Sequence, residues 1–269
     1  MDMLQALVFG LIQGATEYLP VSSSAHLAVA PWLFGWPAPS FAFDILVQLG
    51  TLVAVIFYLR ADLRQIFASS LRGLWQRKLL IDDHARRGWM IIVATLPAVF
   101  FGLVFKKQIE ASFGDVNAVL WQLIATGVLL LVAELLARKQ GSAGKPLTFG
   151  LALLIGFGQA LAIIPGISRS GSTIAMAMVL GVKRDEATRF SFLMSIPVML
   201  GAGVLGARDL LKQPDVLARE GAGIAVSFLV AMLTGFVVIR WFLGFVRSRS
   251  LLPFGVYCVI AGAVGLLLR

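Results

Sequence analysis

Residues with the chemistry to bind or attack an anion are concentrated in two polar stretches. The first, Gln13 to His26, reads Q-G-A-T-E-Y-L-P-V-S-S-S-A-H and lies between apolar segments. Ionisable side chains at membrane depth are costly and usually mark a functional site. The second stretch, Pro165 to Thr173, reads P-G-I-S-R-S-G-S-T. Together the two stretches predict a site for a phosphate group, formed where they meet.

The first stretch combines an acid, an amide, serines and a histidine at helical spacing. Gln13 and Glu17 are four residues apart, so on one helix they share a face. Ser23 and His26 are three apart, and a serine beside a histidine is the minimal activated nucleophile. Glu17 could ligate a divalent cation, or it could orient His26 as the acid of a triad does. For Ser22, close packing in a membrane helix is an equally good explanation.

The second stretch supplies what an anionic ligand needs. Gly166 and Gly171 let the backbone turn and present its amides, and the guanidinium of Arg169 is a planar fork that matches phosphate oxygens. We expect a helix to begin at Ser172 or Thr173, so that its N-terminus adds a partial positive charge. Further hydroxyl groups come from Ser168, Ser170 and Thr173.

Composition indicates that a membrane surrounds these stretches. The chain has 269 residues, of which 59% are hydrophobic and 14% are charged, whereas a soluble domain has roughly 25% charged residues. Basic residues are scattered through loops, so the formal charge of +9 argues for membrane topology and against a nucleic-acid partner. Apolar segments of spanning length occupy approximately 43–60, 88–105, 117–137, 190–207, 221–246 and 251–268.

Each polar stretch is expected to break a membrane helix. In the first, Pro20 disfavours a helical conformation at its predecessor, so the arms 3–19 and 24–36 form a re-entrant hairpin that faces the protein interior. Asp44 and Gln48, at helical spacing in the next span, either support the site or pack helices together. Residues 60–87 carry seven Lys and Arg residues and are expected to form an interfacial amphipathic helix.

The chain also contains an internal repeat. Residues 153–165 resemble residues 6–20, and Gln159 precedes Pro165 much as Gln13 precedes Pro20. Repeated order at one offset indicates duplication, which divides the chain into residues 1–140 and 141–269. Three spans lie between the hairpins and invert the second repeat. The predicted fold is therefore an all-α polytopic membrane protein, an inverted-topology repeat with six full transmembrane helices and two re-entrant hairpins that meet near the midplane.

Loop charge predicts the orientation of this fold. If the loops at 60–87, 138–146, 182–189 and 247–250 share one side, they hold 15 Lys and Arg residues, against 6 on the opposite side. The positive-inside rule then places these loops in the cytoplasm and both termini outside.

These motifs resemble those of the bacterial undecaprenyl-diphosphate phosphatase family, the integral-membrane group associated with bacitracin resistance. The family pattern Glu/Gln-x-x-x-Glu reads here as Gln13-G-A-T-Glu17, followed by Y-L-P-V-S-S-S-A-H. The second pattern, P-G-x-S-R-S-x-x-T, is matched by residues 165–173 without a mismatch. The similarity extends over essentially the whole chain, including F-D-I-L-V-Q-L-G-T at 43–51.

The resemblance implies hydrolysis of undecaprenyl diphosphate to its monophosphate, which recycles a carrier lipid for peptidoglycan. It implies a divalent cation such as Mg²⁺ or Ca²⁺, a place in the bacterial inner membrane and a site that opens to the periplasm. Glu17 matches the essential acid and metal ligand, Ser23 the proposed nucleophile, His26 the catalytic histidine and Arg169 the phosphate-binding arginine. Gln13 takes the neutral option of its position, which weakens its claim to ligate metal. Phosphate contacts are also expected from Ser22, Ser168, Ser170, Gly171 and Thr173.

Alternatives remain open at this stage. Inverted repeats with broken helices are also transporter architecture, so a flippase for a polyprenyl phosphate is the main rival. An acid phosphatase of the PAP2 type would need a second histidine after Arg169, and the sequence has none there. A purely structural membrane protein would leave the intramembrane acid and arginine unexplained. The attacking group is Ser23 or a metal-bound water, and a homodimer is one assembly that the sequence leaves open.

Overall fold

A computed structural model describes residues 1–105, 108, 115–139, 144–212 and 214–269. The described part of the chain is built from α-helices and contains no strand. The helices are α1 (Met3–Thr16), α2 (Ser23–Phe34), α3 (Phe41–Tyr58), α4 (Arg60–Trp75), α5 (Asp83–Val104), α7 (Val116–Lys139), α8 (Phe149–Leu161), α9 (Arg169–Val179), α10 (Arg184–Leu211), α11 (Pro214–Phe245) and α12 (Leu252–Leu267).

The helices confirm the prediction of an all-α, multi-pass membrane protein. Within the described residues, α5, α7, α10 and α11 are each long and apolar enough to span a bilayer. The predicted span 43–60 corresponds to α3, which is followed after Leu59 by a bend of 76° into α4. The predicted span 251–268 corresponds to α12, an apolar helix of only 16 residues. The expected six full spans are thus four long helices, one bent pair and one short helix.

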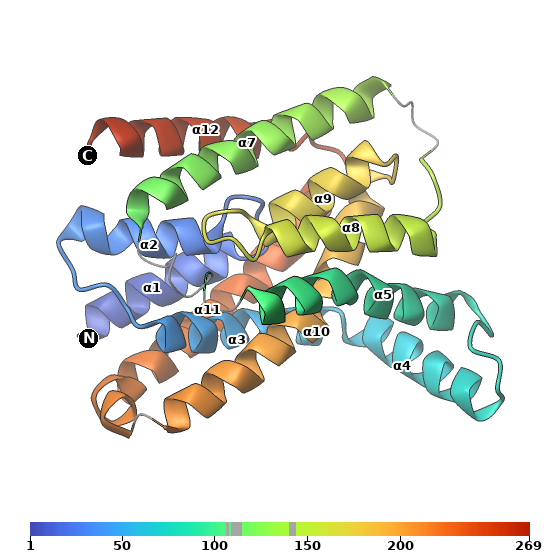
Figure 1. Ribbon diagram of the computed structural model, residues 1–269, viewed down its shortest axis with the longest axis horizontal. Coiled ribbons are helices and arrows are strands. Elements are labelled where there is room, and N and C mark those ends of the chain that lie inside the picture. Colours follow the sequence, from blue (N-terminus) through green and yellow to red (C-terminus); the bar gives the residue numbers. More distant parts are fainter. Residues whose placement is uncertain (106–107, 109–114, 140–143, 213) are drawn as a thin grey trace.

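The structure contains both predicted hairpins. In Figure 1, α1 and α2 enter the molecule from the end where both termini lie, and α8 and α9 enter from the opposite end. Both pairs turn at the centre. The first break comes earlier than Pro20 suggested, because α1 ends at Thr16 and α2 begins at Ser23, which places Glu17 at the C-cap of α1.

Each hairpin packs against a long helix of the other half of the chain. α1 lies along α11, and α8 lies along α5. Glycines allow the close approach: a Cβ on Gly10 would stand 2.7 Å from the carbonyl oxygen of Ser227, and one on Gly156 would collide with the carbonyl oxygen of Ala94. This exchanged packing is what an inverted duplication would produce, and the duplication itself stays a prediction.

Basic loops gather at the end opposite the termini. Arg87 forms an ion pair with Glu186 at 2.6 Å, which joins the start of α5 to the start of α10. Arg184 forms an ion pair with Glu134 near the end of α7 at 2.8 Å and donates to the carbonyl of Arg249 at 3.0 Å. The described parts of the four basic loops therefore share one side, as the charge count requires, while the identity of that side as cytoplasmic stays a prediction.

Candidate functional site at the meeting of the hairpins

Two hydrogen bonds join the hairpins near their breaks, and each links a backbone group of one hairpin to a hydroxyl group of the other. The amide of Gly166 donates to Ser24 Oγ at 3.0 Å, and Ser170 Oγ donates to the carbonyl of Leu19 at 2.9 Å. Gly166 has a φ of +95°, and a Cβ there would lie 2.9 Å from the carbonyl oxygen of Val119. A side chain at this position would therefore be strained in conformation and would collide with α7, so glycine is required for the hairpins to meet.

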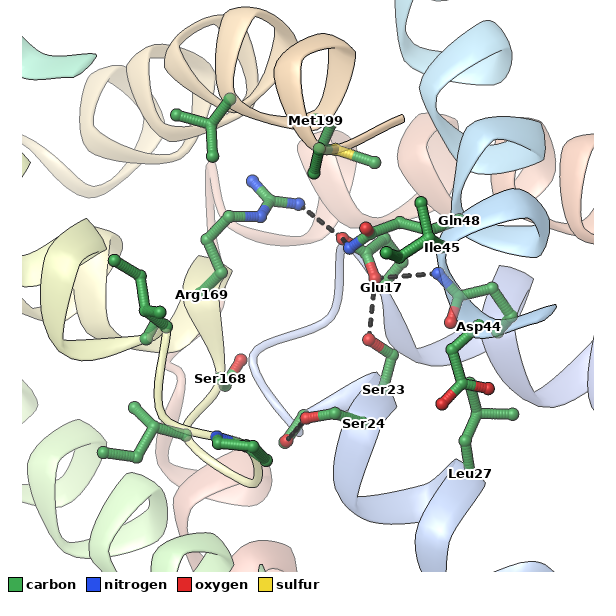
Figure 2. A pocket seen from close by; sticks show the side chains of 18 of the residues that line it. Glu17, Ser23, Ser24, Leu27, Asp44, Ile45, Gln48, Ser168, Arg169 and Met199 are labelled. Carbon is green, nitrogen blue, oxygen red and sulfur yellow. Dashed lines mark hydrogen bonds and ion pairs between the residues drawn. The ribbon is translucent and has the colours of Figure 1, made fainter. Parts of the chain in front are cut away.

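Glu17 is the centre of this junction and is buried, with 4% of its surface exposed. Its Oε2 accepts hydrogen bonds from Gln13 Nε2 at 2.8 Å and from Ser23 Oγ at 2.7 Å. Its Oε1 accepts from Arg169 at 2.7 Å and from Gln48 Nε2 at 3.2 Å. The partners come from four helices, α1, α2, α3 and α9. Figure 2 shows Ser23, Gln48 and Arg169 directed toward the carboxylate. The shared helical face predicted for Gln13 and Glu17 is confirmed.

Arg169 reaches Glu17 from the second hairpin and retains unused donors. It is the first residue of α9, and only its NH2 group contacts the carboxylate. Its Nε and NH1 atoms are buried and have no hydrogen-bond partner within the described part of the chain. The guanidinium carbon lies 5.5 Å from the ring centroid of Tyr18, within cation–π distance. The guanidinium is therefore held in place by protein while most of its donor capacity remains available for an anion.

Ser23 is paired with Glu17 and not with the histidine that the sequence suggested. It is the first residue of α2, and its hydroxyl donates to the carboxylate. The preceding residue, Ser22, has a φ of +68° and caps the helix by accepting a hydrogen bond from the amide of Ala25. This sharp turn directs the Ser23 hydroxyl toward Glu17 of the same hairpin. The hydroxyl is therefore already in contact with a group that can accept its proton.

His26 faces away from the cavity, which corrects the predicted pairing with Ser23. Its Nδ1 lies 2.7 Å from the carbonyl oxygen of Ser22, and its Nε2 lies 2.7 Å from the hydroxyl of Tyr257 on α12. A carbonyl only accepts hydrogen bonds, so Nδ1 carries the proton and Nε2 of the neutral ring accepts from Tyr257. The turn at Ser22 separates the imidazole from the Ser23 hydroxyl even though the two residues are only three apart.

The helix of the second polar stretch, α9, begins earlier than predicted, and this changes where its hydroxyl groups point. α9 starts at Arg169 because Ser168 caps it, accepting from the amide of Gly171 at 3.0 Å. Ser168 lines the cavity, as do Ser22 and Ser23. Ser170 donates to Leu19, and Thr173 donates to the carbonyl of Arg169 at 2.7 Å. Among the described residues that line the cavity, Ser170, Gly171 and Thr173 are absent, so their expected phosphate contacts gain no support from the geometry.

The cavity between the hairpins has a volume of about 240 Å³. Asp44 and Gln48 of α3 line it, and their expected place beside the site is confirmed in position. In the described structure, Oδ1 of Asp44 is buried and accepts no hydrogen bond. Gln159 of α8 also lines the cavity, although it was not among the site residues predicted from the sequence. Its alignment with Gln13 in the repeat was the signal that could have done so.

The cavity contains carboxylates that could bind a divalent cation, but the described residues do not form a complete set of metal ligands. Among the described residues, no group of three or more His, Cys, Asp and Glu side chains could hold a metal ion. The roughly four acceptor positions of Glu17 are all occupied by donors, whereas Asp44 has a free oxygen. Mg²⁺ commonly uses one or two carboxylates and takes its other ligands from phosphate and water. Asp44 fits the role of such a carboxylate, whereas Glu17 would have to give up one of its donors to bind the cation.

Known proteins resemble this chain over nearly its whole length. The family model described as "Bacitracin resistance protein BacA" matches residues 6–264. A protein of Nocardioides sp. named undecaprenyl-diphosphatase is 43% identical over 99% of this chain and 96% of its own length. Proteins of the same name from Myxococcus xanthus and Chlorobium luteolum are 42% and 41% identical over the whole chain, covering 89% and 97% of their own lengths. This chain therefore belongs to the bacitracin resistance protein BacA family.

Proposed function

We propose that this protein hydrolyses undecaprenyl diphosphate to undecaprenyl phosphate and inorganic phosphate. The observation that carries the proposal is a cavity at the meeting of two broken helices, where a serine is paired with a buried carboxylate opposite an arginine that has two unpaired nitrogens. The names of the relatives at 41–43% identity support the same reaction.

The donors of the second hairpin suit the diphosphate. Moving a phosphate out of water is unfavourable unless charge-assisted hydrogen bonds replace its hydration. Arg169 offers Nε and NH1 for this purpose while NH2 stays on Glu17. The N-termini of α2 and α9 both lie at the centre of the molecule (Figure 1), and each adds a partial positive charge where the anion would sit.

Ser23 and Glu17 are placed for nucleophilic attack on the terminal phosphorus of the diphosphate. The Ser23 hydroxyl already donates to Glu17 at 2.7 Å, within the distance needed for general base catalysis. Glu17 would take this proton as Ser23 Oγ bonds to the terminal phosphorus, and the bond from that phosphorus to the bridging oxygen would break. Undecaprenyl phosphate would leave with the bridging oxygen, and the proton held by Glu17 would pass to this leaving group. Water would then cleave the phosphoserine ester, releasing inorganic phosphate and restoring the serine.

A divalent cation would supply charge neutralisation on the diphosphate. Asp44 is the carboxylate placed to hold it, through the oxygen that has no partner among the described residues, and Glu17 would join it only by giving up one of its donors. Arg169 on the opposite wall would keep the diphosphate oriented toward Ser23, so the cation and the guanidinium would share the negative charge.

The substrate's long apolar tail explains why such a site lies in a membrane protein. We place the protein in the bacterial inner membrane, with membrane lipids around it and the cavity open to the periplasmic side. The 15-to-6 distribution of Lys and Arg between the two sides supports placing the basic loops in the cytoplasm and both termini outside. The periplasmic opening of the cavity is what the resemblance to the family implies. Recycling of the carrier lipid for peptidoglycan synthesis would follow from product release on that side.

The direct test is phosphate release by purified protein. We expect inorganic phosphate and undecaprenyl phosphate in equal amounts from undecaprenyl diphosphate in detergent, with added Mg²⁺ or Ca²⁺. Ser23→Ala should remove this activity, whereas a metal-bound water as nucleophile would leave a substantial part of it. Transport of the lipid without phosphate release would refute the hydrolase and favour the flippase.

A further inference from the structure

Gln159 is a buried amide whose hydrogen-bonding groups are unused. The residue lies on α8 with 2% of its surface exposed, and it lines the cavity beside Arg169. Neither its Nε2 nor its Oε1 has a hydrogen-bond partner among the residues that the structure describes. Leaving such a buried group unpaired is unfavourable, and native proteins rarely do so. The cavity that Gln159 lines is a place from which a ligand or water can reach both groups.

Its counterpart in the first hairpin shows what kind of partner is missing. Gln13 and Gln159 are 146 residues apart, and so are the helix-capping residues Ser22 and Ser168. Gln13 is satisfied because Nε2 donates to the carboxylate of Glu17. At the same offset from Glu17 the second hairpin has Ile163. Gln159 accordingly donates to no carboxylate within the described part of the chain.

The unpaired donors of the second hairpin line one cavity. They are Nε2 of Gln159 and the Nε and NH1 atoms of Arg169, and both residues line the space that holds Glu17 and Ser23. An arginine and an amide with free N–H groups match the oxygens of a phosphate. We propose that Gln159 binds the diphosphate of the substrate, Nε2 donating to a phosphate oxygen and Oε1 accepting from water or a protonated phosphate oxygen. This inference rests on the proposed function for the identity of the diphosphate.

Gln159→Leu tests the proposal, because leucine fills a similar volume and removes both unpaired polar atoms. In detergent without ligand, the variant should melt at the same temperature as the natural protein or higher, since no existing hydrogen bond is lost. Gln13→Leu is the matched control and should melt at a lower temperature, because it deprives Glu17 of a donor. This contrast separates a ligand contact from a structural one.

Ligand binding supplies the second measurement. Inorganic diphosphate should raise the melting temperature of the natural protein, and Gln159→Leu should lose most of that rise. The KM for undecaprenyl diphosphate should increase by about three- to tenfold, the effect of losing one hydrogen bond. Gln159→Glu should raise KM further, because a carboxylate repels the phosphate.

The outcomes are distinguishable from those of the proposed function. If the natural protein releases no phosphate, the hydrolase proposal fails, while the melting shift with inorganic diphosphate still reports on Gln159. An unchanged KM and an unchanged melting shift in Gln159→Leu would overturn the proposal. So would a loss of melting temperature equal to that of Gln13→Leu, because Gln159 would then serve the fold through a partner such as a buried water.

Discussion

The two hairpins share one scaffold and differ in the side chains that carry charge. Ser22 caps α2 and Ser168 caps α9, each through a hydrogen bond from the amide three residues later. At equal offset, however, the first hairpin has Glu17 where the second has Ile163, and the first has Ser23 where the second has Arg169. The scaffold brings two helix N-termini together, while these two differences place an acid and a hydroxyl on one side and a cation on the other.

This difference shows how a symmetric scaffold can perform an asymmetric reaction. A second carboxylate in place of Ile163 would repel the substrate, and a second arginine in place of Ser23 would remove the nucleophile. The ion pair between Glu17 and Arg169, at 2.7 Å, joins the unlike halves. Breaking such a buried pair from one side leaves an uncompensated charge, which costs about 3–5 kcal/mol in other proteins. Changes at this pair should therefore have the largest effects.

Removing the acid from the first hairpin should have the greatest effect on turnover. Glu17→Gln hardly changes volume but abolishes the proton acceptor for Ser23 and the partner of Arg169. We expect kcat/KM to fall on the order of 10⁴-fold, the upper range for a general base, while the protein remains folded. Phosphate release and the far-UV circular dichroism spectrum would be measured on the same sample. Activity near that of the natural protein at saturating Mg²⁺ would exclude Glu17 from the catalytic set.

Removing the cation from the second hairpin should come next. Arg169→Ala should lose about 2–4 kcal/mol of transition-state stabilisation, as other preorganised donors do. Arg169→Lys keeps the charge but loses the planar fork, so it should be clearly impaired but less so than alanine. The measurement is kcat/KM together with the melting temperature for both variants. A fully active Arg169→Ala would contradict a phosphate site on this hairpin, and equal losses of stability and activity would indicate a packing role.

The sequence predicted the scaffold better than it predicted the direction of side chains. Hydropathy identified the spans, and Pro20 and the serine-rich stretches identified the breaks. The sequence placed Glu17 and Arg169, 152 positions apart, in one site because the two polar stretches were expected to meet, and the structure shows that the two side chains form an ion pair. The pairing of Ser23 with His26 was wrong because spacing does not reveal the turn that Ser22 makes at a φ of +68°.

In the second polar stretch, the sequence did not determine which residue begins the helix. Several serines and a threonine stand within six residues, and any of them could cap a helix. The hydrogen bonds show that Ser168 is the cap, which turns the hydroxyls of Ser170 and Thr173 toward backbone carbonyls. For Gln159 the repeat gave a signal, its alignment with Gln13, but the lack of a hydrogen-bond partner among the described residues is visible only in three dimensions.

The next prediction asks whether the divalent cation binds on the side of the cavity where Glu17 and Asp44 lie. Figure 2 places Asp44 on the side of Glu17 and Ser23, away from Arg169. If Asp44 helps to hold the cation, Asp44→Asn should raise the Mg²⁺ concentration needed for half-maximal activity by at least about tenfold. Its activity at saturating Mg²⁺ should largely recover. A variant with an unchanged Mg²⁺ titration would place the cation elsewhere.

The smallest expected effect concerns His26, for which the second hairpin again provides the comparison. His26 donates from Nδ1 to the carbonyl of the capping Ser22, and Ser172, 146 residues later, donates from its hydroxyl to the carbonyl of the capping Ser168 at 2.8 Å. Since a serine does the same at the equivalent position, this contact holds a helix start and requires no proton transfer. We therefore predict that His26 positions Ser22, and through it Ser23, in place of the catalytic role that the resemblance implies.

Asparagine separates this role from catalysis, because its amide can donate to the Ser22 carbonyl but cannot accept a proton near neutral pH. His26→Asn should keep kcat/KM within about threefold of the natural value, and His26→Ala should lose up to about tenfold, the effect of one hydrogen bond. The pH dependence of kcat/KM should keep its shape in His26→Asn, because no histidine titration would control the reaction. If both variants lost activity equally and the pH profile lost a limb, His26 would be the base, and the cavity would have to rearrange to bring it to Ser23.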